Sequence, residues 1–338
     1  MKILKNKTIL ITGGTGSLGK ALTKHIFKEC PEIKKLVIFS RDEQKQFIMA
    51  QEFPPQEFPQ IRFLIGDVRD ANRLKRAFRD VDFVIHAAAM KHVHLAEYNP
   101  SECVKTNIGG AENVIQACLE TNVERVVALS TDKACAPINL YGATKLTSDK
   151  LFVAANNITG SNKIKFSVVR YGNVMGSNGS VIPFFLNQRK KGFLPITHPN
   201  MTRFNISLQG GVDMVMHALK HAWGGEIIIP KIPSYKITDV ANAVDSECEK
   251  RIVGIRPGEK IHEEMITESD SIHTYDLGTY YTIIPSNPKW NLNEFISHFK
   301  AKKVAENFSY TSGKNTVWES VDDLKELIKK NIDTKFEA

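Results

Sequence analysis

The segment TILITGGTGSLG, residues 8–19, places a glycine-rich turn directly after a short apolar run. The run is typical of a buried strand, and Gly13, Gly16 and Gly19 have the spacing G-x-x-G-x-x-G. These glycines permit a tight turn and a close approach of the backbone to a pyrophosphate, and the helix expected at residues 20–29 directs its N-terminal amides at the phosphates. A glycine triplet alone is a weak signal, but the flanking strand and helix indicate a dinucleotide-binding loop.

Apolar runs and helical patterns alternate after this loop. The predicted strands are residues 35–39, 61–65, 82–85, 125–129, 164–171 and 225–230, and the predicted helices are 72–79, 101–120 and 141–156. This alternation predicts an α/β fold with a Rossmann-type doubly wound parallel sheet. We expect the dinucleotide-binding domain at residues 1–173, with returns near 208–230, and a smaller α/β substrate lobe at 174–207 and 231–338.

Several segments of this smaller lobe carry recognisable patterns. Residues 172–180 are rich in glycine and asparagine, which fits a loop that leaves the sheet and covers a ligand. The turn Arg-Pro-Gly-Glu-Lys at 256–260 could bring Arg256 to a diphosphate and Glu259 to ribose hydroxyls, although its composition alone indicates only a polar turn. Residues 320–323 resemble a capping box before a last helix.

The composition narrows the class of protein. A chain of 338 residues, 42% apolar and 24% charged, suits one large domain or one domain with a smaller lobe. No run approaches the ~18 apolar residues of a membrane span. The N-terminus has no signal-peptide pattern, so we expect a cytoplasmic protein without a membrane partner.

Charge and cysteine content exclude further classes. The net charge of +8 comes from dispersed lysines and arginines, which argues against a nucleic-acid partner and fits anionic small molecules. The five cysteines form no C-x-x-C pair and fit reduced thiols. We predict no metal site, because His92-Val-His94 is more typical of a polar loop than of a ligand set.

The end of the second strand is expected to select the cofactor. It reads Ser40-Arg41-Asp42. An acidic residue at this distance from the glycines binds the adenosine 2′-hydroxyl of NAD, whereas an arginine accommodates the 2′-phosphate of NADP. We favour NADP through Arg41. The alternative is that Arg41 is a solvated loop residue and Asp42 takes the hydroxyl.

The third and fourth strands end in further candidates for cofactor contact. Asp67, in Gly-Asp-Val, can reach the adenine amine. Ala87, Ala88 and Ala89 leave room for the cofactor to lie across the strand ends. Tight packing of a helix on the sheet explains these alanines equally well.

The segment STDKACAPINLYGATK, residues 130–145, indicates an active site after the fifth strand. Tyr141 and Lys145 are four residues apart and share one face of a helix. A tyrosine acting as a base at pH 7 needs about 4 kcal/mol of help for its phenolate. A lysine ammonium ~4.5 Å away supplies about that at an effective dielectric near 20. The order of glycine loop, Ser-Thr strand end and Tyr-x-x-x-Lys pair is that of the short-chain dehydrogenase/reductase superfamily; a chance surface pair is the alternative.

Over nearly its whole length the chain resembles the inverting UDP-N-acetylglucosamine 4,6-dehydratases of that superfamily, the first enzymes of pseudaminic acid biosynthesis. The resemblance rests on motifs at residues 12–19, 40–43, 87–93, 97–100, 130–134, 137–145, 170–174, 201–204 and 256–260. Cys135-Ala136 departs from the usual Ala-Asn, and Asn205 from the usual aromatic residue. Both departures could alter the fit of the sugar.

The resemblance implies a mechanism centred on Asp132-Lys133. Tyr141, with Lys145 and Thr131, takes the C4 hydroxyl proton while hydride passes from C4 to NADP. The C4 ketone acidifies the C5 hydrogen, which Lys133 removes if burial and nearby cations lower its pKa. Asp132, kept protonated, protonates the departing C6 hydroxyl. Hydride then returns to C6, and protonation of C5 from the opposite face inverts that centre. An ordinary salt-bridged corner is the alternative interpretation of the pair.

The resemblance also implies the residues that contact the ligands and the assembly. The NADP contacts are Gly13, Thr15, Gly16, Ser17, Leu18, Gly19, Ser40, Arg41, Asp42, Lys45, Asp67, Val68, Ala87, Ala88, Ala89, Lys91, Thr106, Tyr141, Lys145 and Val174. The UDP-sugar contacts are Lys91, Asn173, Val181, Thr197, Met201, Arg203, Arg256 and Glu259. A homo-oligomer, either dimer or hexamer, is implied as well. A retaining 4,6-dehydratase or C5-epimerase on a related UDP-sugar, and an NADP-binding regulator without catalysis, remain alternatives.

Overall fold

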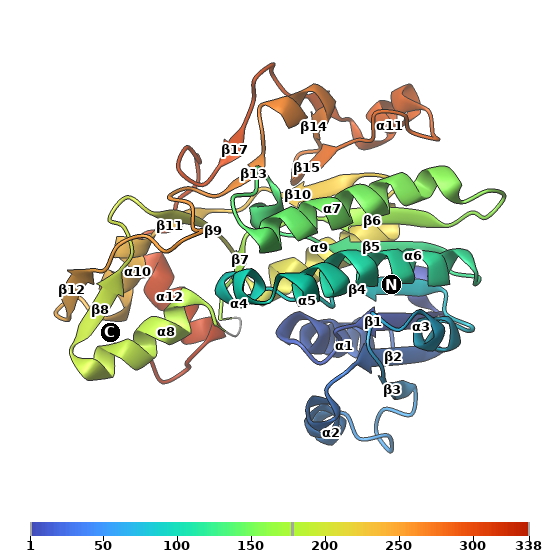
Figure 1. The fold of residues 1–338 in the computed structure, drawn as a ribbon, viewed down its shortest axis with the longest axis horizontal. Coiled ribbons are helices and arrows are strands. Elements are labelled where there is room, and N and C mark those ends of the chain that lie inside the picture. The colour runs from blue at the N-terminus through green and yellow to red at the C-terminus, as the bar shows by residue number, and fades with distance from the viewer. Residues whose placement is uncertain (1, 177–178, 337–338) are drawn as a thin grey trace.

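The computed structural model, which describes residues 2–176 and 179–336, is built around a ten-stranded sheet (Figure 1). Its strands lie in the order β16-β14-β15-β10-β6-β5-β4-β1-β2-β3. Their bounds are β1 Thr8–Thr12, β2 Lys35–Ser40, β3 Ile61–Ile65, β4 Phe83–His86, β5 Arg125–Leu129, β6 Lys165–Val169, β10 Ile227–Pro230, β14 Thr274–Asp276, β15 Tyr280–Ile283 and β16 Lys302–Lys303.

The run from β3 to β10 is parallel throughout, which confirms the predicted doubly wound Rossmann sheet. Its strands are apolar because helices cover both faces. In β1, side chains alternate between the two cores: Leu10 packs on one side, and Ile9 and Ile11 pack on the other. The strand order reverses between β1 and β4, so ligands are expected at the carboxyl ends of these two parallel strands.

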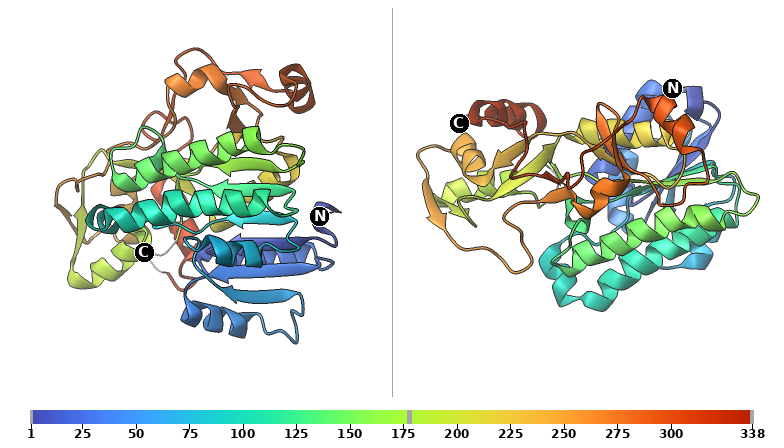
Figure 2. Two further views of the ribbon diagram at one scale, coloured as in Figure 1. Left: turned by 45° about the vertical axis from the view of Figure 1, so that its right-hand side comes forward. Right: turned by 90° about the horizontal axis from the view of Figure 1, so that it is seen from above.

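Helices form the outer layers on both sides of the sheet (Figure 2). α1 and α9 pack together on one face, and α3, α6 and α7 cover the other. The helices are α1 Ser17–Glu29, α2 Glu43–Glu52, α3 Ala71–Ala77, α4 Val93–Tyr98, α5 Pro100–Val104, α6 Gly110–Leu119, α7 Leu140–Ala155, α8 Val181–Gln188, α9 Leu208–His221, α10 Ile237–Val244, α11 Leu292–Phe299 and α12 Val321–Asn331. The helix predicted at 101–120 is divided into α5 and α6 by a π-helical turn, Lys105–Gly109.

A smaller lobe of short strands and helices lies beside the carboxyl ends of the parallel strands (Figure 1). Helices α8, α10 and α12 share one apolar core there. The lobe contains a three-stranded sheet in the order β11-β9-β7 and a parallel pair β12-β8, and a further pair, β13-β17, lies between the lobe and the large sheet. The strands are β7 Asn173–Val174, β8 Phe193–Ile196, β9 Thr202–Ile206, β11 Ser234–Lys236, β12 Glu249–Ile252, β13 Glu264–Ile266 and β17 Tyr310–Thr311.

One part of the predicted lobe boundary was wrong. Residues 231–338 were assigned to the smaller lobe, but β14, β15 and β16 lie within that range and extend the large sheet. β15 pairs antiparallel with β10 and thereby covers an edge that would otherwise be exposed. The predicted capping box is present, because the Ser320 and Asp323 side chains each accept a hydrogen bond from the other's backbone N–H. Within the described ranges no helix is long and apolar enough to cross a membrane.

Candidate active site

The glycine-rich loop joins β1 to α1 and is held by close backbone contacts. Gly13 has φ +65°, and a Cβ built there would lie 2.8 Å from the backbone nitrogen of Ala88. A Cβ on Gly19 would lie 2.2 Å from the carbonyl oxygen of Gly14. Only glycine fits both positions. The loop leads directly into the N-terminus of α1, where the amides of Ser17 and Leu18 have no preceding helical carbonyl, so the arrangement fits a pyrophosphate.

The segment after β4 lies directly against this loop. The Thr12 hydroxyl accepts hydrogen bonds from the amides of Ala87 (3.2 Å) and Ala88 (3.3 Å). Two stretches about 75 residues apart therefore form one surface at the point where the strand order reverses. Lys91 follows in an exposed part of the same segment.

The end of β2 gives different roles to its two charged residues. The Asp42 carboxylate accepts a hydrogen bond from the Lys45 amide at 2.9 Å and caps α2, while the Lys45 ammonium lies 3.3 Å from it. The Arg41 side chain is 62% exposed, and its guanidinium lies 3.9 Å from Asp67. Ser40 is buried, and its hydroxyl accepts a hydrogen bond from Gln46.

The other residues predicted to contact the adenosine side lie after β3 and on the π-helical turn. The Asp67 carboxylate is 2.7 Å from the Arg69 guanidinium, so it is already engaged by a cation. Val68 is buried and would contact a Cβ on Gly110 at the start of α6. Thr106 is buried with its hydroxyl unpaired within the described chain.

The Asp132–Lys133 corner begins where β5 ends. The Ser130 amide donates to the Val169 carbonyl at 2.7 Å, and the Asp132 amide donates to the Tyr171 carbonyl at 3.0 Å, which continues the pairing of β5 with β6. The first turn of α7 packs against this corner through Gly142, where a Cβ would lie 2.1 Å from the Lys133 carbonyl oxygen. Gly142 therefore allows Tyr141 to lie near Lys133.

Three side-chain oxygens surround the Lys133 ammonium. Its Nζ lies 3.0 Å from Asp132 Oδ1, 3.2 Å from Glu263 Oε1 and 3.5 Å from Asn173 Oδ1. Asp132 is fully buried and Glu263 is 2% exposed. Arg203 Nε is 3.7 Å from the same Glu263 oxygen. Asn173 and Arg203 were predicted substrate contacts, but Glu263 was not predicted.

The pKa directions follow from these contacts. Burial lowers the pKa of Lys133, but the carboxylates of Asp132 and Glu263 outweigh it, so the net pKa is raised. This corrects the expectation that burial and cations lower it. Burial is the main reason why the pKa of Asp132 is raised, and the negative charge of Glu263 adds to it. A raised pKa suits the predicted role of Asp132 as an acid.

Tyr141 and Lys145 are both buried on the same face of α7. Burial raises the pKa of Tyr141 to about 12. The positive charge of Lys133 opposes this most, followed by a hydrogen bond with Thr131. Burial lowers the pKa of Lys145, against the effect of Asp149. The cation that most favours the phenolate is therefore Lys133, whereas we expected Lys145.

One face of the sheet β11-β9-β7 forms a polar wall over the corner. Asn173 pairs in register with Asn205, and Arg203 with Tyr235, so these four residues share a face. Asn205 Nδ2 donates to Glu319 Oε2 at 2.7 Å. The asparagine that departs from the usual aromatic residue is thus held by a carboxylate from the C-terminal segment.

The other predicted substrate residues lie around this wall. The Thr197 hydroxyl is 3.2 Å from the Met201 sulfur, and Met201 is buried. Val181 begins α8 and packs on the core of the smaller lobe, and Val174 lies in β7. Ser177 and Asn178, within the predicted covering loop, lie outside the described residues.

The turn at 256–260 is placed over the start of α7. Asn139, the N-cap of α7, donates to the Gly258 carbonyl at 2.7 Å, and Lys260 Nζ donates to the Cys135 carbonyl at 2.7 Å. Arg256 is exposed and lies 3.8 Å from Glu259, whose Oε2 atom is buried and unpaired in the described chain.

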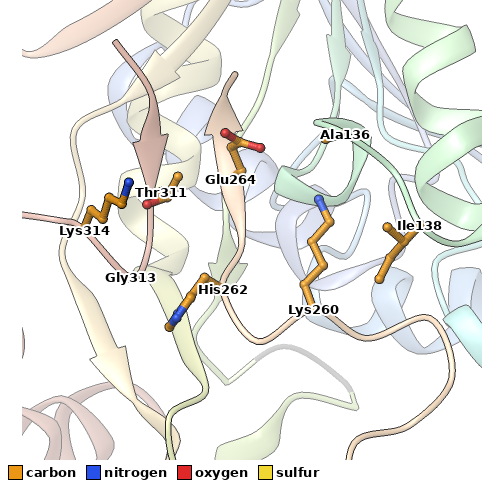
Figure 3. Close-up of a pocket in the computed structure, with 8 residues that line it drawn as sticks. All are labelled: Ala136, Ile138, Lys260, His262, Glu264, Thr311, Gly313 and Lys314. Carbon is orange, nitrogen blue, oxygen red and sulfur yellow. The ribbon is translucent and has the colours of Figure 1, made fainter. Parts of the chain in front are cut away.

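A pocket of about 730 Å³ lies near the Asp132–Lys133 corner, beside the segment that leads from Lys260 into β13 (Figure 3). Lys260, His262 and Glu264 line it, whereas the intervening Glu263 reaches Lys133. The remaining lining residues are Ala136, Ile138, Thr311, Gly313 and Lys314. The pocket is therefore separated from Lys133 by the chain that carries Glu263. The described residues contain no cluster of His, Cys, Asp or Glu suited to a metal ion.

The sheet order and the Tyr-x-x-x-Lys pair at the start of α7 define a Rossmann-fold protein of the extended short-chain dehydrogenase/reductase type. More narrowly, a family model described as "Polysaccharide biosynthesis protein" matches residues 9–285, and the chain belongs to this family.

Relatives of the chain carry different names. The chain is 54% identical over 96% of its length to a UDP-N-acetylglucosamine 4,6-dehydratase (inverting) of Campylobacter jejuni, of which 98% is covered. It is 42% identical over 96% of its length to a UDP-glucose 4-epimerase of Rickettsia bellii, of which 95% is covered. The crystal structure of Pen from Bacillus thuringiensis matches with a TM-score of 0.87 at 37% identity, covering 97% of this chain and 98% of that one.

Proposed function

We propose that the protein is an NADP-dependent UDP-N-acetylglucosamine 4,6-dehydratase that inverts C5. Its product would be UDP-2-acetamido-2,6-dideoxy-β-L-arabino-hexos-4-ulose, the first intermediate of pseudaminic acid biosynthesis. The observation that carries this proposal is the placement of Asp132 and Lys133 beside Tyr141 in one buried corner. The 54% identity to the Campylobacter dehydratase supports the same reaction.

The residues of the corner provide a group for each proton transfer. A nicotinamide cofactor held at the glycine-rich loop would supply a hydride acceptor for C4 and a hydride donor for C6. Tyr141 removes the C4 hydroxyl proton, and Lys133 removes the C5 proton once its amine is neutral. Asp132 is the acid for the departing C6 hydroxyl, because burial raises the pKa of its carboxyl and so favours the protonated form. Because the pKa of Lys133 is raised, we expect the C5 exchange rate to increase with pH.

The end of β2 supports NADP over NAD. Asp42 already accepts the Lys45 amide as the cap of α2, which occupies the carboxylate that would otherwise bind a 2′-hydroxyl. The exposed guanidinium of Arg41 follows the buried Ser40 at the strand end. An arginine in this position suits the 2′-phosphate of NADP.

Substrate contacts are proposed from the polar wall and the neighbouring turns. Asn173 and Arg203 lie close enough to the corner to contact the sugar or its phosphates. Lys91, Val181, Thr197, Met201, Arg256 and Glu259 are proposed as further UDP-sugar contacts.

Assembly and location are further parts of this proposal. Leu95, Tyr98 and Val104 on α4 and α5 are 46%, 86% and 40% exposed, which supports a homo-oligomer formed through this surface. Light scattering should give a multiple of the 37.9 kDa chain mass, and a monomer at micromolar concentration would contradict this. The free thiols in the structure support a reducing, cytoplasmic location.

The name of the Rickettsia relative makes C4 epimerisation the second candidate. The two reactions are separated by incubating the purified protein with NADP and UDP-N-acetylglucosamine and following the products by proton NMR. We expect a 4-keto-6-deoxy sugar with inverted C5 that incorporates deuterium from heavy water at that carbon. A product that differs only at C4, or one with retained C5, would contradict the proposal.

A further inference from the structure

The corner contains two buried carboxylates for one lysine, and the proposed reaction uses only one of them. Asp132 and Glu263 both contact the Lys133 ammonium, at 3.0 Å and 3.2 Å. Each also has a second oxygen, Asp132 Oδ2 and Glu263 Oε2, that is buried without a hydrogen-bond partner in the described chain. A single ammonium neutralises only one carboxylate, so two ionised carboxylates here would repel each other.

The surroundings of the two carboxylates differ. Glu263 has a second cation, because Arg203 Nε lies 3.7 Å from the oxygen that also contacts Lys133. Asp132 is fully buried, and its other close partner is the neutral hydroxyl of Thr131 at 3.0 Å. The charge of an ionised carboxylate is therefore better compensated on Glu263 than on Asp132.

We propose that Glu263 is a positioning residue that serves as the permanent counter-ion of Lys133 and thereby leaves Asp132 free to carry the proton it donates at C6. The inference rests on the proposed function for the identity of the acid step. Asp132 needs its proton for that step, and an isolated Asp132–Lys133 ion pair would remove it. If Glu263 is the ionised partner of Lys133, Asp132 can keep its proton beside the same lysine.

The pKa directions agree with this division of roles. Burial raises the pKa of Glu263, but Lys133 and Arg203 outweigh it, so its net pKa is lowered. The pKa of Asp132 is raised, as described above. Two neighbouring carboxyls whose pKa values move in opposite directions are the pattern expected of an acid beside a permanent anion.

Glu263 is also held rigidly. Its amide donates to the Ser312 hydroxyl at 2.9 Å, and the Ser312 amide donates back to the Glu263 carbonyl at 2.8 Å. The other titratable groups near the pair come from several elements. They are Arg203 on β9, Tyr141 on α7, Tyr235 on β11 and Lys260 before β13.

The first test is the pH profile of water loss from UDP-N-acetylglucosamine. Glu263→Gln removes a negative charge beside both Asp132 and Lys133, so both of their pKa values fall. Both limbs of the bell-shaped profile should therefore move to lower pH, by about one unit or more. Glu263→Asp keeps the charge and should keep the limbs in place even if turnover falls. The transient NADPH signal of C4 oxidation should change less than about threefold in Glu263→Gln.

Glu264→Gln is the matched control, because Glu264 is the adjacent residue but lines the pocket on the other side of the chain. Its profile should match that of the parent. An unshifted profile for Glu263→Gln, or an equal shift for Glu264→Gln, would overturn the inference.

The second test needs no substrate and no folded Glu263 variant. Infrared difference spectra of the unmodified protein and Asp132→Asn, both at pH 7, should reveal the carbonyl stretch of a protonated carboxylic acid in the former that is missing in the latter. If that band is absent from the parent protein, Asp132 is ionised and the inference fails. Failure of the proposed function is a separate result, in which the parent protein does not dehydrate UDP-N-acetylglucosamine at any pH.

Discussion

The glycine-rich loop and the Asp132–Lys133 corner both lie at the carboxyl ends of sheet strands, but they are built in different ways. The loop is shaped by backbone contacts within residues 12–19 and by the backbone of Ala87 and Ala88, which follow β4. The corner takes its shape from side chains at 131–141, 173, 203 and 263, which lie on separate elements.

The loop depends on local properties of the chain, whereas the protonation of the corner does not. A glycine that fits a turn is required by its own φ angle and by atoms close to it in sequence, so the pattern alone reveals it. The charge of a buried lysine depends on which carboxylates the fold brings to it. A motif search therefore finds the corner without finding its protonation state.

The largest effects are expected from substitutions of the residues that transfer protons in the Asp132–Lys133 corner. Tyr141→Phe should abolish every step, including transient NADPH absorbance, because no group then takes the C4 hydroxyl proton. Lys133→Met should still give that absorbance but should lose C5 deuterium exchange, since only the C5 base is missing. Loss of a positioned acid or base costs ~100- to 10,000-fold in rate.

The two variants are compared by absorbance and by proton NMR in heavy water. Parent-like C5 exchange in Lys133→Met would exclude Lys133 as the base. NADPH formation in Tyr141→Phe would exclude Tyr141 as the C4 base.

The next largest effect is expected from a substitution that disrupts the backbone of the glycine-rich loop. Gly19→Ala introduces a Cβ 2.2 Å from the Gly14 carbonyl oxygen, so the free energy of unfolding should fall by about 1–3 kcal/mol or more, together with dinucleotide affinity. Gly109→Ala is the control, since a Cβ there meets no atom within 4 Å. Denaturant unfolding measures the free energy of unfolding of each variant, and cofactor titration measures its dinucleotide affinity. Equal stability of the two variants would contradict the local account of the loop.

A smaller effect concerns cofactor choice at the end of β2. Arg41→Ala should weaken NADP binding by about 10- to 100-fold, the equivalent of one charge-assisted contact, and leave NAD binding nearly unchanged. Asp42→Ala should mainly destabilise α2, because the carboxylate caps that helix. Isothermal titration calorimetry with NADP and with NAD measures the ratio of the two affinities for each variant. A larger loss for NAD than for NADP in Arg41→Ala would reverse the assignment.

The smallest expected effect concerns Ala136, on the turn that follows the corner. Ala136 has φ +43°, a conformation that alanine disfavours by about 1–2 kcal/mol and that asparagine tolerates better. Ala136→Asn should therefore raise the free energy of unfolding by about 0.5–1 kcal/mol. Ala305→Asn, also on the surface but without a positive φ, should give no gain. A loss of stability in Ala136→Asn would show that the turn is not strained at this residue.

The sequence alone determined the Rossmann class, the position of the dinucleotide loop and the presence of Asp132, Lys133, Tyr141 and Lys145 in one segment. These features depend on short-range rules: apolar runs form strands, glycines permit the turn, and residues four apart share a helix face. The capping box at Ser320 was predictable for the same reason.

Tertiary structure decided the features that depend on distant partners. The pairing of β15 with β10 brought β14, β15 and β16 into the large sheet, because strand pairing depends on an available edge and not on local composition. Glu263 lies 130 residues after Lys133 in an unremarkable acidic stretch, yet together with Asp132 it raises the lysine pKa against the effect of burial. Coulomb interactions depend on distance in space, and the distance between two side chains so far apart in the chain is set only by the fold.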